Sequence, residues 1–304
     1  SRRIGGTILL PHVGVAGLLQ NGLGEAGVRR RVDRRRPARA LRQKIAQAGA
    51  RARRHLRGLD EEARRRHARL RGLLHVNDPL RLGFLRDLAT GKSLPSGERE
   101  DRLAAMAAAA LLDVRRPAEA WGALEAACAN ETFRQELGQL VGFLEDGRRE
   151  GVLDWRGLGP VPLQVHARYR QDEILAALGA GGEAGIPRLQ GGVYYEPVCN
   201  ADILLVTLRK SEGTFSPTTM YRDYAISPSR FHWESQNSAH PGTVTGRRYL
   251  EGSSHVLLFV REVQDQANGV AEAYTFLGKA TLESAEGERP MRIVWRLEHP
   301  MPGP

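Results

Sequence analysis

The stretch "LDWRGLGPVPLQV", residues 153–165, separates two parts of the chain with different sequence patterns. Its prolines and glycines interrupt regular structure, because proline lacks a backbone N–H and glycine favours turns. Before this stretch, apolar residues recur every three or four positions; after it, short apolar runs are bounded by turn residues. We therefore predict an α+β protein with a boundary near residue 155, helices first and strands last.

The part before the boundary is predicted to be helical over residues 40–150. Asn77 or Asp78 can cap a helix that has Pro79 at its first position, and Gly147 offers a helix stop after a regular apolar stripe. Residues 1–28 are Gly-rich without a clear period, so we expect an irregular or truncated start. Residues 29–155 form the predicted helical, Arg-rich connector.

The part after the boundary, residues 156–304, is predicted to be a β-rich domain with one short helix in "QDEILAALG". Strand-like runs separated by glycine-containing turns favour a curled antiparallel sheet or a small barrel. These runs are "GGVYYEPV", "ADILLVTLRK", "SHVLLFVREV", "AYTFLGKATL" and "MRIVWRLEHP".

The positive charge of the chain is concentrated in one segment. The formal net charge is +10, yet residues 29–71 alone carry 18 basic and 4 acidic residues. Such a segment would attract a phosphate backbone without sequence preference; packing against an acidic neighbouring domain and a solvated basic face remain alternatives. The phosphate-contact candidates of this segment are Arg34, Arg35, Arg36, Arg53, Arg54, Arg64 and Arg65.

The composition argues against several other classes. Cys128 and Cys199 lack the paired Cys/His spacing of a zinc site, and we expect two reduced thiols and no metal. The longest apolar runs are too short to span a membrane, and no signal peptide is recognisable. We expect a cytoplasmic protein without a membrane partner.

The stretch "SPTTMYRDYAISPSRFHWESQ", residues 216–236, combines aromatic rings with polar groups in an unusual density. Recognition of an unstacked base needs flat faces for stacking and hydrogen-bonding groups for the base edge. The base-reading candidates are Tyr221, Tyr224, Trp233, Glu234, Gln236, Asp223 and His232. The candidates for holding flanking phosphates are Arg222, Arg230, Ser216 and Thr218.

A structural interpretation of the same stretch stays open. "FHWESQ" alternates with the period of a strand, so Phe231 and Trp233 could share one buried face. The function would then belong to the opposite face, which carries His232, Glu234 and Gln236. In "TVTGRRYLEGS", Arg247 and Arg248 follow a glycine that favours either a phosphate-contacting turn or a hairpin with a charged tip.

Several motifs that follow one another between residues 161 and 302 resemble a known family. They are "VPLQVHARYRQDEILAALG", "SPTTMYRDYAISPSRFHWESQNS", "TGRRYL", "LLFVRE", "YTFLGKA" and "GERPMRIVWRLEHPMP". Together they resemble the domain of unknown function numbered 3427, which occurs at the C-terminus of superfamily II DEAD/DEAH-like helicases, often with a phospholipase-D-like nuclease. "RLRGLLHVNDPLRLGFLR" also resembles the helical segment that precedes this domain.

The resemblance implies a DNA-binding accessory region of a helicase–nuclease system. Some relatives are modification-dependent restriction enzymes used in defence, in which this domain is the proposed reader of methylated cytosine. No catalytic residue is carried over, and ATP and Mg²⁺ would belong to a motor in cis or in trans, because "LATGKS" has Arg86 where a P-loop needs glycine. A protein–protein or architectural module that regulates the motor is the alternative, and an enzyme with its own hydrolytic site is the least favoured.

Overall fold

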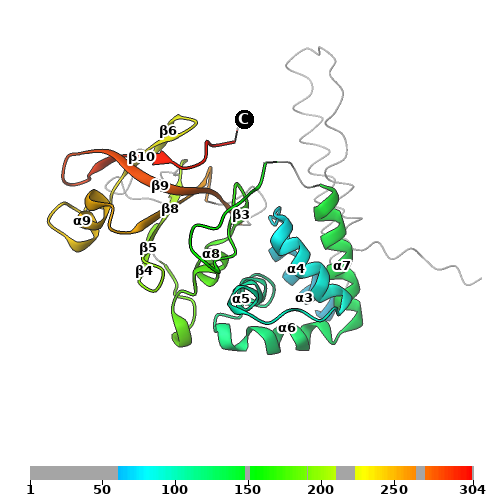
Figure 1. Ribbon diagram of the computed structural model, residues 1–304. Helices are drawn as coiled ribbons and strands as arrows, with labels where there is room; N and C mark the ends of the chain where they lie inside the picture. Colours follow the sequence, from blue (N-terminus) through cyan, green and yellow to red (C-terminus); the bar gives the residue numbers. More distant parts are fainter. Residues whose placement is uncertain (1–60, 148–150, 190, 210–222, 265–270, 303–304) are drawn as a thin grey trace, which may run out of the picture.

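The computed structural model describes residues 61–147, 151–189, 191–209, 223–264 and 271–302. Figure 1 shows the helices that precede residue 147 on one side, a large sheet on the other, and α8 between them. The α+β class, with helices first and a β-rich part last, is confirmed. The helices are α3 (Glu61–Leu70), η1 (Arg71–Leu73), α4 (Pro79–Thr90), α5 (Glu98–Leu112), η2 (Pro117–Glu119), α6 (Ala120–Cys128), α7 (Glu131–Asp146), α8 (Gln171–Leu178), η3 (Gly182–Ala184) and α9 (Val244–Glu251).

The strands form a two-stranded pair and one large sheet. They are β1 (Leu153–Asp154), β2 (Gln164–Val165), β3 (Arg168–Tyr169), β4 (Val193–Glu196), β5 (Ala201–Thr207), β6 (Tyr224–Ser227), β7 (Arg230–Glu234), β8 (His255–Arg261), β9 (Tyr274–Glu286) and β10 (Arg292–Leu297). The large sheet has the order β4-β5-β8-β9-β10-β7-β6, and β3 pairs with β9. β5 and β8 run parallel, and the other pairs between described strands are antiparallel. The sheet is therefore open and mixed, neither purely antiparallel nor a closed barrel.

Local sequence signals account for the helix ends. The carboxylate of Asp78 accepts a hydrogen bond from the Arg81 backbone N–H at 2.8 Å, and Pro79 occupies the first position of α4. Asn130 caps α7 in the same way, through Phe133 N at 2.9 Å. The start of α4 agrees with the sequence prediction. The stretch "LATGKS" is the end of α4, where Gly91 adopts a left-handed φ of 70°, and not a strand-to-helix loop.

Two hydrophobic cores lie on the two sides of the sheet. The larger core joins helical residues such as Leu137 and Leu175 to the sheet residues Ile203, Leu257 and Phe276. The alanine-rich helix α5 packs closely against α8 in this core, because small side chains allow the two helices to approach. The second core lies on the opposite side of the sheet and includes aromatic residues of β7, β10 and α9.

Most of the segment 243–253 is the helix α9 (Val244–Glu251), so neither the turn nor the hairpin predicted there is correct. Thr243 accepts a hydrogen bond from Gly246 N at 3.0 Å and thereby starts α9. Gly252, with a left-handed φ of 61°, ends it. Among the described residues, no helix combines the length and apolar character that a membrane span requires.

Candidate functional site

Seven side chains form a largely polar surface at one end of the sheet, which we call the outer face. The pairing register of β6, β7 and β10 places them on the same side of the three strands. They are Tyr224 on β6, Arg230, His232 and Glu234 on β7, and Arg292, Val294 and Arg296 on β10. The register also puts Arg296 on the same side of the sheet as Leu257, which packs in the larger core. The helices thus cover one part of this side and leave the β7–β10 part accessible.

The alternate residues of β7 face the second core. Phe231 is 1% exposed and Trp233 is 5% exposed. The Trp233 ring lies edge-on to Tyr249 of α9, with 5.6 Å between the ring centroids, and also contacts Trp295. The structural interpretation therefore holds for Phe231 and Trp233, and the Trp233 ring has no free face for a base. The sequence predicted that, if Phe231 and Trp233 are buried, the functional groups of β7 lie on its opposite face. That face is part of the outer face.

Two rings on the outer face are stacked on each other at the accessible end of the sheet. Tyr224 and His232 are direct cross-strand partners, and their ring centroids lie 4.6 Å apart with an interplanar angle of 14°. Tyr224 is 51% exposed, although a tyrosine usually buries most of its ring. The pair offers a preorganised flat surface at a sheet edge, because stacking on His232 restricts the rotamers of Tyr224.

Two of the three arginines of the outer face share one glutamate. Arg230 and Arg296 are cross-strand neighbours, and both guanidinium groups pair with Glu283, Arg296 at 3.1 Å. The hydrogen bond from Arg230 is the main cause of the lowered pKa of Glu283. Glu283 lies where the β9–β10 register shifts, so the irregularity directs an extra carboxylate toward the two arginines. Arg296 remains 66% exposed and Arg292 57% exposed, so their guanidinium groups still reach solvent.

The remaining polar candidates of this stretch have structural contacts. Asp223 accepts a hydrogen bond from the backbone N–H of Glu234 at 3.0 Å, which fixes the end of β7. The carbonyl of Gln236 accepts from Ala239 N, and its side chain is half-buried close to Gly191. Glu234 is half-buried opposite Arg292. The carboxylates of this group therefore lie at the border of the outer face.

Arg247 and Arg248 lie on the other side of the sheet from the outer face, because α9 covers the second core. Arg248 donates two hydrogen bonds to the buried Asp202, at 2.9 and 2.8 Å, and its guanidinium lies 3.8 Å above the Tyr195 ring. It is thus used in fixing α9 to β5. Arg247 is exposed, with one contact to the Gly242 carbonyl. The structure does not bring this pair together with Arg230.

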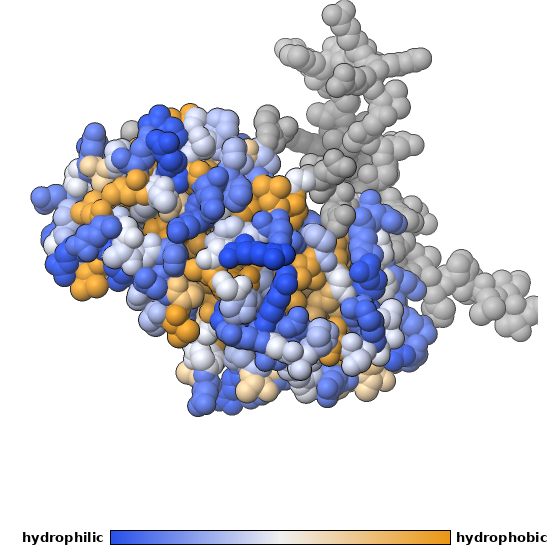
Figure 2. All heavy atoms as spheres, in the orientation of Figure 1, coloured by the Kyte–Doolittle hydropathy of each residue, from blue (hydrophilic) through white to orange (hydrophobic). Residues whose placement is uncertain are grey.

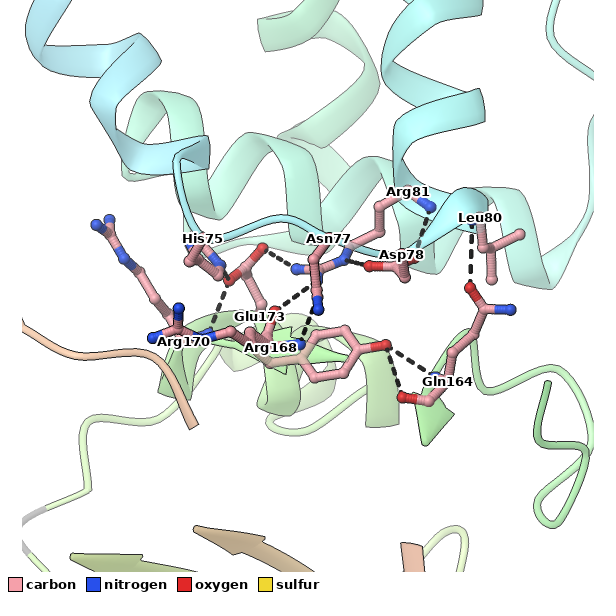
Figure 3. A network of polar contacts seen from close by, with 10 residues as sticks. His75, Asn77, Asp78, Leu80, Arg81, Gln164, Arg168, Arg170 and Glu173 are labelled. Atoms are coloured by element: carbon pink, nitrogen blue, oxygen red, sulfur yellow. Dashed lines mark hydrogen bonds and ion pairs between the residues drawn. The ribbon is translucent and has the colours of Figure 1, made fainter. Parts of the chain in front are cut away.

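A second polar cluster, which we call the buried junction, joins the helical part to the β-rich part (Figure 3). Arg81 of α4 is 4% exposed and binds Asp78 at 2.5 Å and Glu173 of α8 at 2.7 Å. It also donates to the Arg168 carbonyl at 2.5 Å, and its guanidinium lies 4.0 Å above the Tyr169 ring. All three nitrogens and one face of this guanidinium therefore have a partner, as a buried charge requires.

Glu173 completes the buried junction from the other side. Its second oxygen accepts hydrogen bonds from His75 and from the backbone N–H of Arg170. Burial alone would raise the pKa of Glu173, but the neighbouring His75, Arg81 and Arg170 N–H outweigh it and lower the pKa to about 2. Burial also lowers the pKa of His75, which favours its neutral form.

The buried junction has no room for a substrate. The cavity beside Arg81 and Glu173 measures about 10 Å³, which is less than a ligand pocket needs by more than an order of magnitude. Asn77 and Gln164 extend the network through Arg168 N and Leu80 N, so the polar groups serve to join backbone segments. We interpret the buried junction as structural.

Sequence reasoning missed both the buried junction and part of the outer face. The signals were present, because "HVNDPLR" and "RYRQDE" concentrate charged and polar groups among apolar residues. The alternation in "RIVWRL" also separates Arg292 and Arg296 from Ile293 and Trp295, which are buried in the structure, but no site residue was predicted from it.

Several predicted residues lie outside the described part of the chain. They are Arg34, Arg35, Arg36, Arg53, Arg54, Ser216, Thr218, Tyr221 and Arg222, and the side chain of Arg64. Arg65 is exposed and pairs with Glu61 one helical turn away. The described residues contain no group of three or more His, Cys, Asp or Glu side chains arranged to hold a metal ion.

Residues 163–303 match a protein family described as Domain of unknown function (DUF3427). The match covers the β-rich part from β2 to the end of β10, including α8 and all residues of the outer face. A search of the curated proteins found no match to the chain. This part of the chain therefore carries the domain that its motifs resemble.

Proposed function

We propose that the chain, with its domain of unknown function at residues 163–303, is a DNA-recognition region of a helicase–nuclease system. In this proposal the outer face contacts an unstacked or extruded base, and methylated cytosine in a restriction (defence) enzyme is the substrate we favour. The chain supplies recognition, whereas ATP hydrolysis and DNA cleavage belong to domains in cis or in trans.

The stacked pair of Tyr224 and His232 is the observation that carries the proposal. A half-exposed ring at a sheet edge offers a face on which any base can stack, and base–aromatic stacking is worth ~1–3 kcal/mol. Arg230, Arg292 and Arg296 lie on the same face, where they can contact phosphates on either side of such a base. The outer face therefore combines an aromatic ring for base stacking with basic groups for phosphate contacts, as binding of single-stranded nucleic acid requires.

Charge elsewhere in the chain supports the same assignment. Residues 29–71 hold 18 of the 45 basic residues but only 4 acidic ones, and they would supply phosphate contacts that carry no sequence information. The β-rich part is close to neutral, with 14 basic and 16 acidic residues from Val161 onward. The division of labour we propose is therefore that the basic segment provides affinity and the outer face provides selectivity.

One observation favours an architectural module as the second candidate. Glu283 already pairs with both Arg230 and Arg296, so part of the charge on the outer face is neutralised within the protein. A mixed-charge surface with an exposed ring also suits docking of a protein domain. DNA binding by the chain distinguishes the two candidates.

The test is a gel-shift titration of the full chain with a duplex that carries methylated cytosine, the same duplex unmodified, and a single strand. We expect Tyr224→Ala to weaken binding to the preferred DNA roughly five- to 150-fold, because ~1–3 kcal/mol of stacking is lost. The matched control is Ile226→Ala on the same strand, since Ile226 is also exposed, at 42%. Its affinity should remain within about twofold of the unchanged protein.

Each outcome decides between the candidates. Absence of DNA binding by the full chain would reject recognition and favour the architectural module. Equal loss for Tyr224→Ala and Ile226→Ala would show that β6 matters only for folding. Equal binding of methylated and unmodified DNA would reject recognition of a modified base, but it would leave the proposal that a base stacks on Tyr224.

A further inference from the structure

At one place on the outer face, two arginines already hold an anion that belongs to the protein itself. Arg230 of β7 and Arg296 of β10 are direct cross-strand partners. Like charges directly opposite each other in a sheet repel, so an anion between the two guanidinium groups is favourable. Glu283 of β9 supplies this anion, because its Oε1 pairs with Arg230 and its Oε2 lies 3.1 Å from Arg296. We call the two arginines the arginine clamp.

The carboxylate lies in the arginine clamp because β9 is irregular at this point. Leu282 pairs with Trp295 and Ser284 pairs with Val294, so Glu283 is the extra residue between two successive cross-strand pairs. Such a bulge re-aims a side chain, and bulges are frequent beside functional sites. The backbone of β9 therefore determines where this carboxylate lies.

Glu283 leaves most hydrogen-bond donors of the arginine clamp unused. The side chains of Arg230 and Arg296 are 47% and 66% exposed, whereas Glu283 is 16% exposed. A guanidinium group has five N–H donors. Within the part of the chain that the structure describes, Arg230 donates one hydrogen bond to Glu283, and Oε2 of Glu283 makes no hydrogen bond despite its closeness to Arg296. The remaining donors are available to an anion from outside the protein.

We propose that the arginine clamp binds one backbone phosphate of DNA, and that Glu283 occupies the place of this phosphate in the free protein. A carboxylate and a phosphodiester each carry one negative charge spread over two oxygen atoms, and arginine binds both with the same donors. Glu283 is then a competitor built into the sheet: it keeps the two guanidinium groups together and lowers the affinity of the outer face for DNA.

This proposal rests on the proposed function, because it assigns the phosphate that accompanies the base stacked on Tyr224. Arg230 and His232 are two residues apart on β7, which corresponds to ~7 Å along a strand. The arginine clamp is thus a direct neighbour of the stacked pair of Tyr224 and His232. The phosphate and the stacked base would come from the same nucleotide or from adjacent ones.

The experiment titrates a fluorescently labelled single-stranded oligonucleotide with the full chain and measures the anisotropy at low, constant ionic strength, because salt screens exposed charges. Glu283→Gln removes the competing charge but keeps a side-chain oxygen that can accept a hydrogen bond from Arg230. We expect it to tighten binding about three- to tenfold, because the phosphate no longer has to displace a carboxylate.

Glu286→Gln is the matched control. It makes the same change of charge on the same strand, but Glu286 is 78% exposed and lies 3.9 Å from Arg292, outside the arginine clamp. Its affinity for the oligonucleotide should stay within about twofold of the unchanged protein, since an exposed pair at this distance interacts weakly.

A second comparison uses a protein in which Arg230 and Arg296 are both replaced by glutamine. In this background the further exchange Glu283→Gln releases no guanidinium group, so we expect it to change the affinity by less than about twofold. The difference between the two backgrounds measures the coupling between the glutamate and the arginine clamp.

A role of Glu283 in folding alone gives a different result. Glu283→Gln would then lower the urea midpoint and leave the affinity for the oligonucleotide within about twofold. That result, or equal tightening by Glu286→Gln, would overturn the arginine clamp but leave base stacking on Tyr224 intact. If neither the unchanged protein nor Glu283→Gln bound the oligonucleotide, the arginine clamp and the proposed function would both be rejected.

Discussion

The buried junction and the outer face use similar side chains under opposite conditions. Both contain arginine–glutamate ion pairs: Arg81 with Glu173 in one, and Arg230 and Arg296 with Glu283 in the other. In the buried junction the arginine and the glutamate are at most 4% exposed, whereas Arg296 is 66% exposed. Figure 2 shows hydrophilic and hydrophobic residues interspersed over the sheet side of the molecule, so polarity alone does not mark a site.

This difference separates residues that hold the fold from residues that can bind a ligand. A buried charge must have all of its partners within the protein, because the loss of one leaves an uncompensated charge away from water. An exposed pair contributes little to stability and can exchange its partner for a phosphate. Burial and the number of free donors therefore indicate function better than residue type.

The largest effect is expected for Arg81→Met. The exchange leaves Asp78 and Glu173 buried without their cation, and we expect the free energy of unfolding to fall by ~3–5 kcal/mol. Arg86→Met on the same helix is the control, because Arg86 is 55% exposed and pairs with Glu145. Arg86→Met should lower the free energy of unfolding by less than ~1 kcal/mol. Urea denaturation measures both, and similar values would contradict the distinction between the two regions.

The second-largest effect is expected when acid destabilises the buried junction. The pKa of Glu173 is lowered to about 2 in the folded protein, so its stabilisation is complete above the unfolded pKa of 4.5 and is lost as pH falls toward 2. The contribution is on the order of 3 kcal/mol. The pKa of His75 is lowered from 6.5, so the unfolded chain binds its proton first and stability already declines below pH 6.5.

His75→Gln separates the two parts of the acid response. The amide can still donate a hydrogen bond to Glu173, but it takes up no proton. The decline of the urea midpoint between pH 6.5 and 5 should become shallower, and the decline below pH 4.5 should remain. An unchanged slope in the upper range would exclude His75 as its cause.

The smallest effect is expected on the outer face. Arg296→Gln should change stability by less than ~0.5 kcal/mol but reduce the slope of log affinity for DNA against log salt by about 1. Arg247→Gln is the matched control, since Arg247 is exposed on the opposite side of the sheet. Its salt slope should be unchanged. If Arg247→Gln reduced the salt slope by the same amount, DNA would not bind preferentially to the outer face.

The sequence was sufficient to predict features that depend on local spacing. Asp78 and Pro79 indicate the start of α4, and the alternation of Phe231 and Trp233 with His232 predicts which side of β7 is buried. Both signals lie within a few residues, because capping and strand alternation are local properties.

Features that depend on distant partners were not predictable. Arg81 and Glu173 are 92 positions apart, and the sequence around each residue does not indicate that the other is its partner. Strand alternation carries no information on direction, so the parallel pairing of β5 with β8 was missed. A turn or a hairpin was predicted in place of α9, because its eight residues contain a glycine and Thr243 was not recognised as its cap.

The core shared by helices and sheet has a consequence for the limits of the matched domain. Leu175 and Ala177 of α8 are fully buried, and α5, which lies outside residues 163–303, packs against α8. A fragment cut at residue 163 would expose an apolar surface that water disfavours by ~25 cal/mol per Å². We therefore expect the folding unit to extend beyond the matched region, and a truncation at the boundary of the sequence match to cut through this shared core.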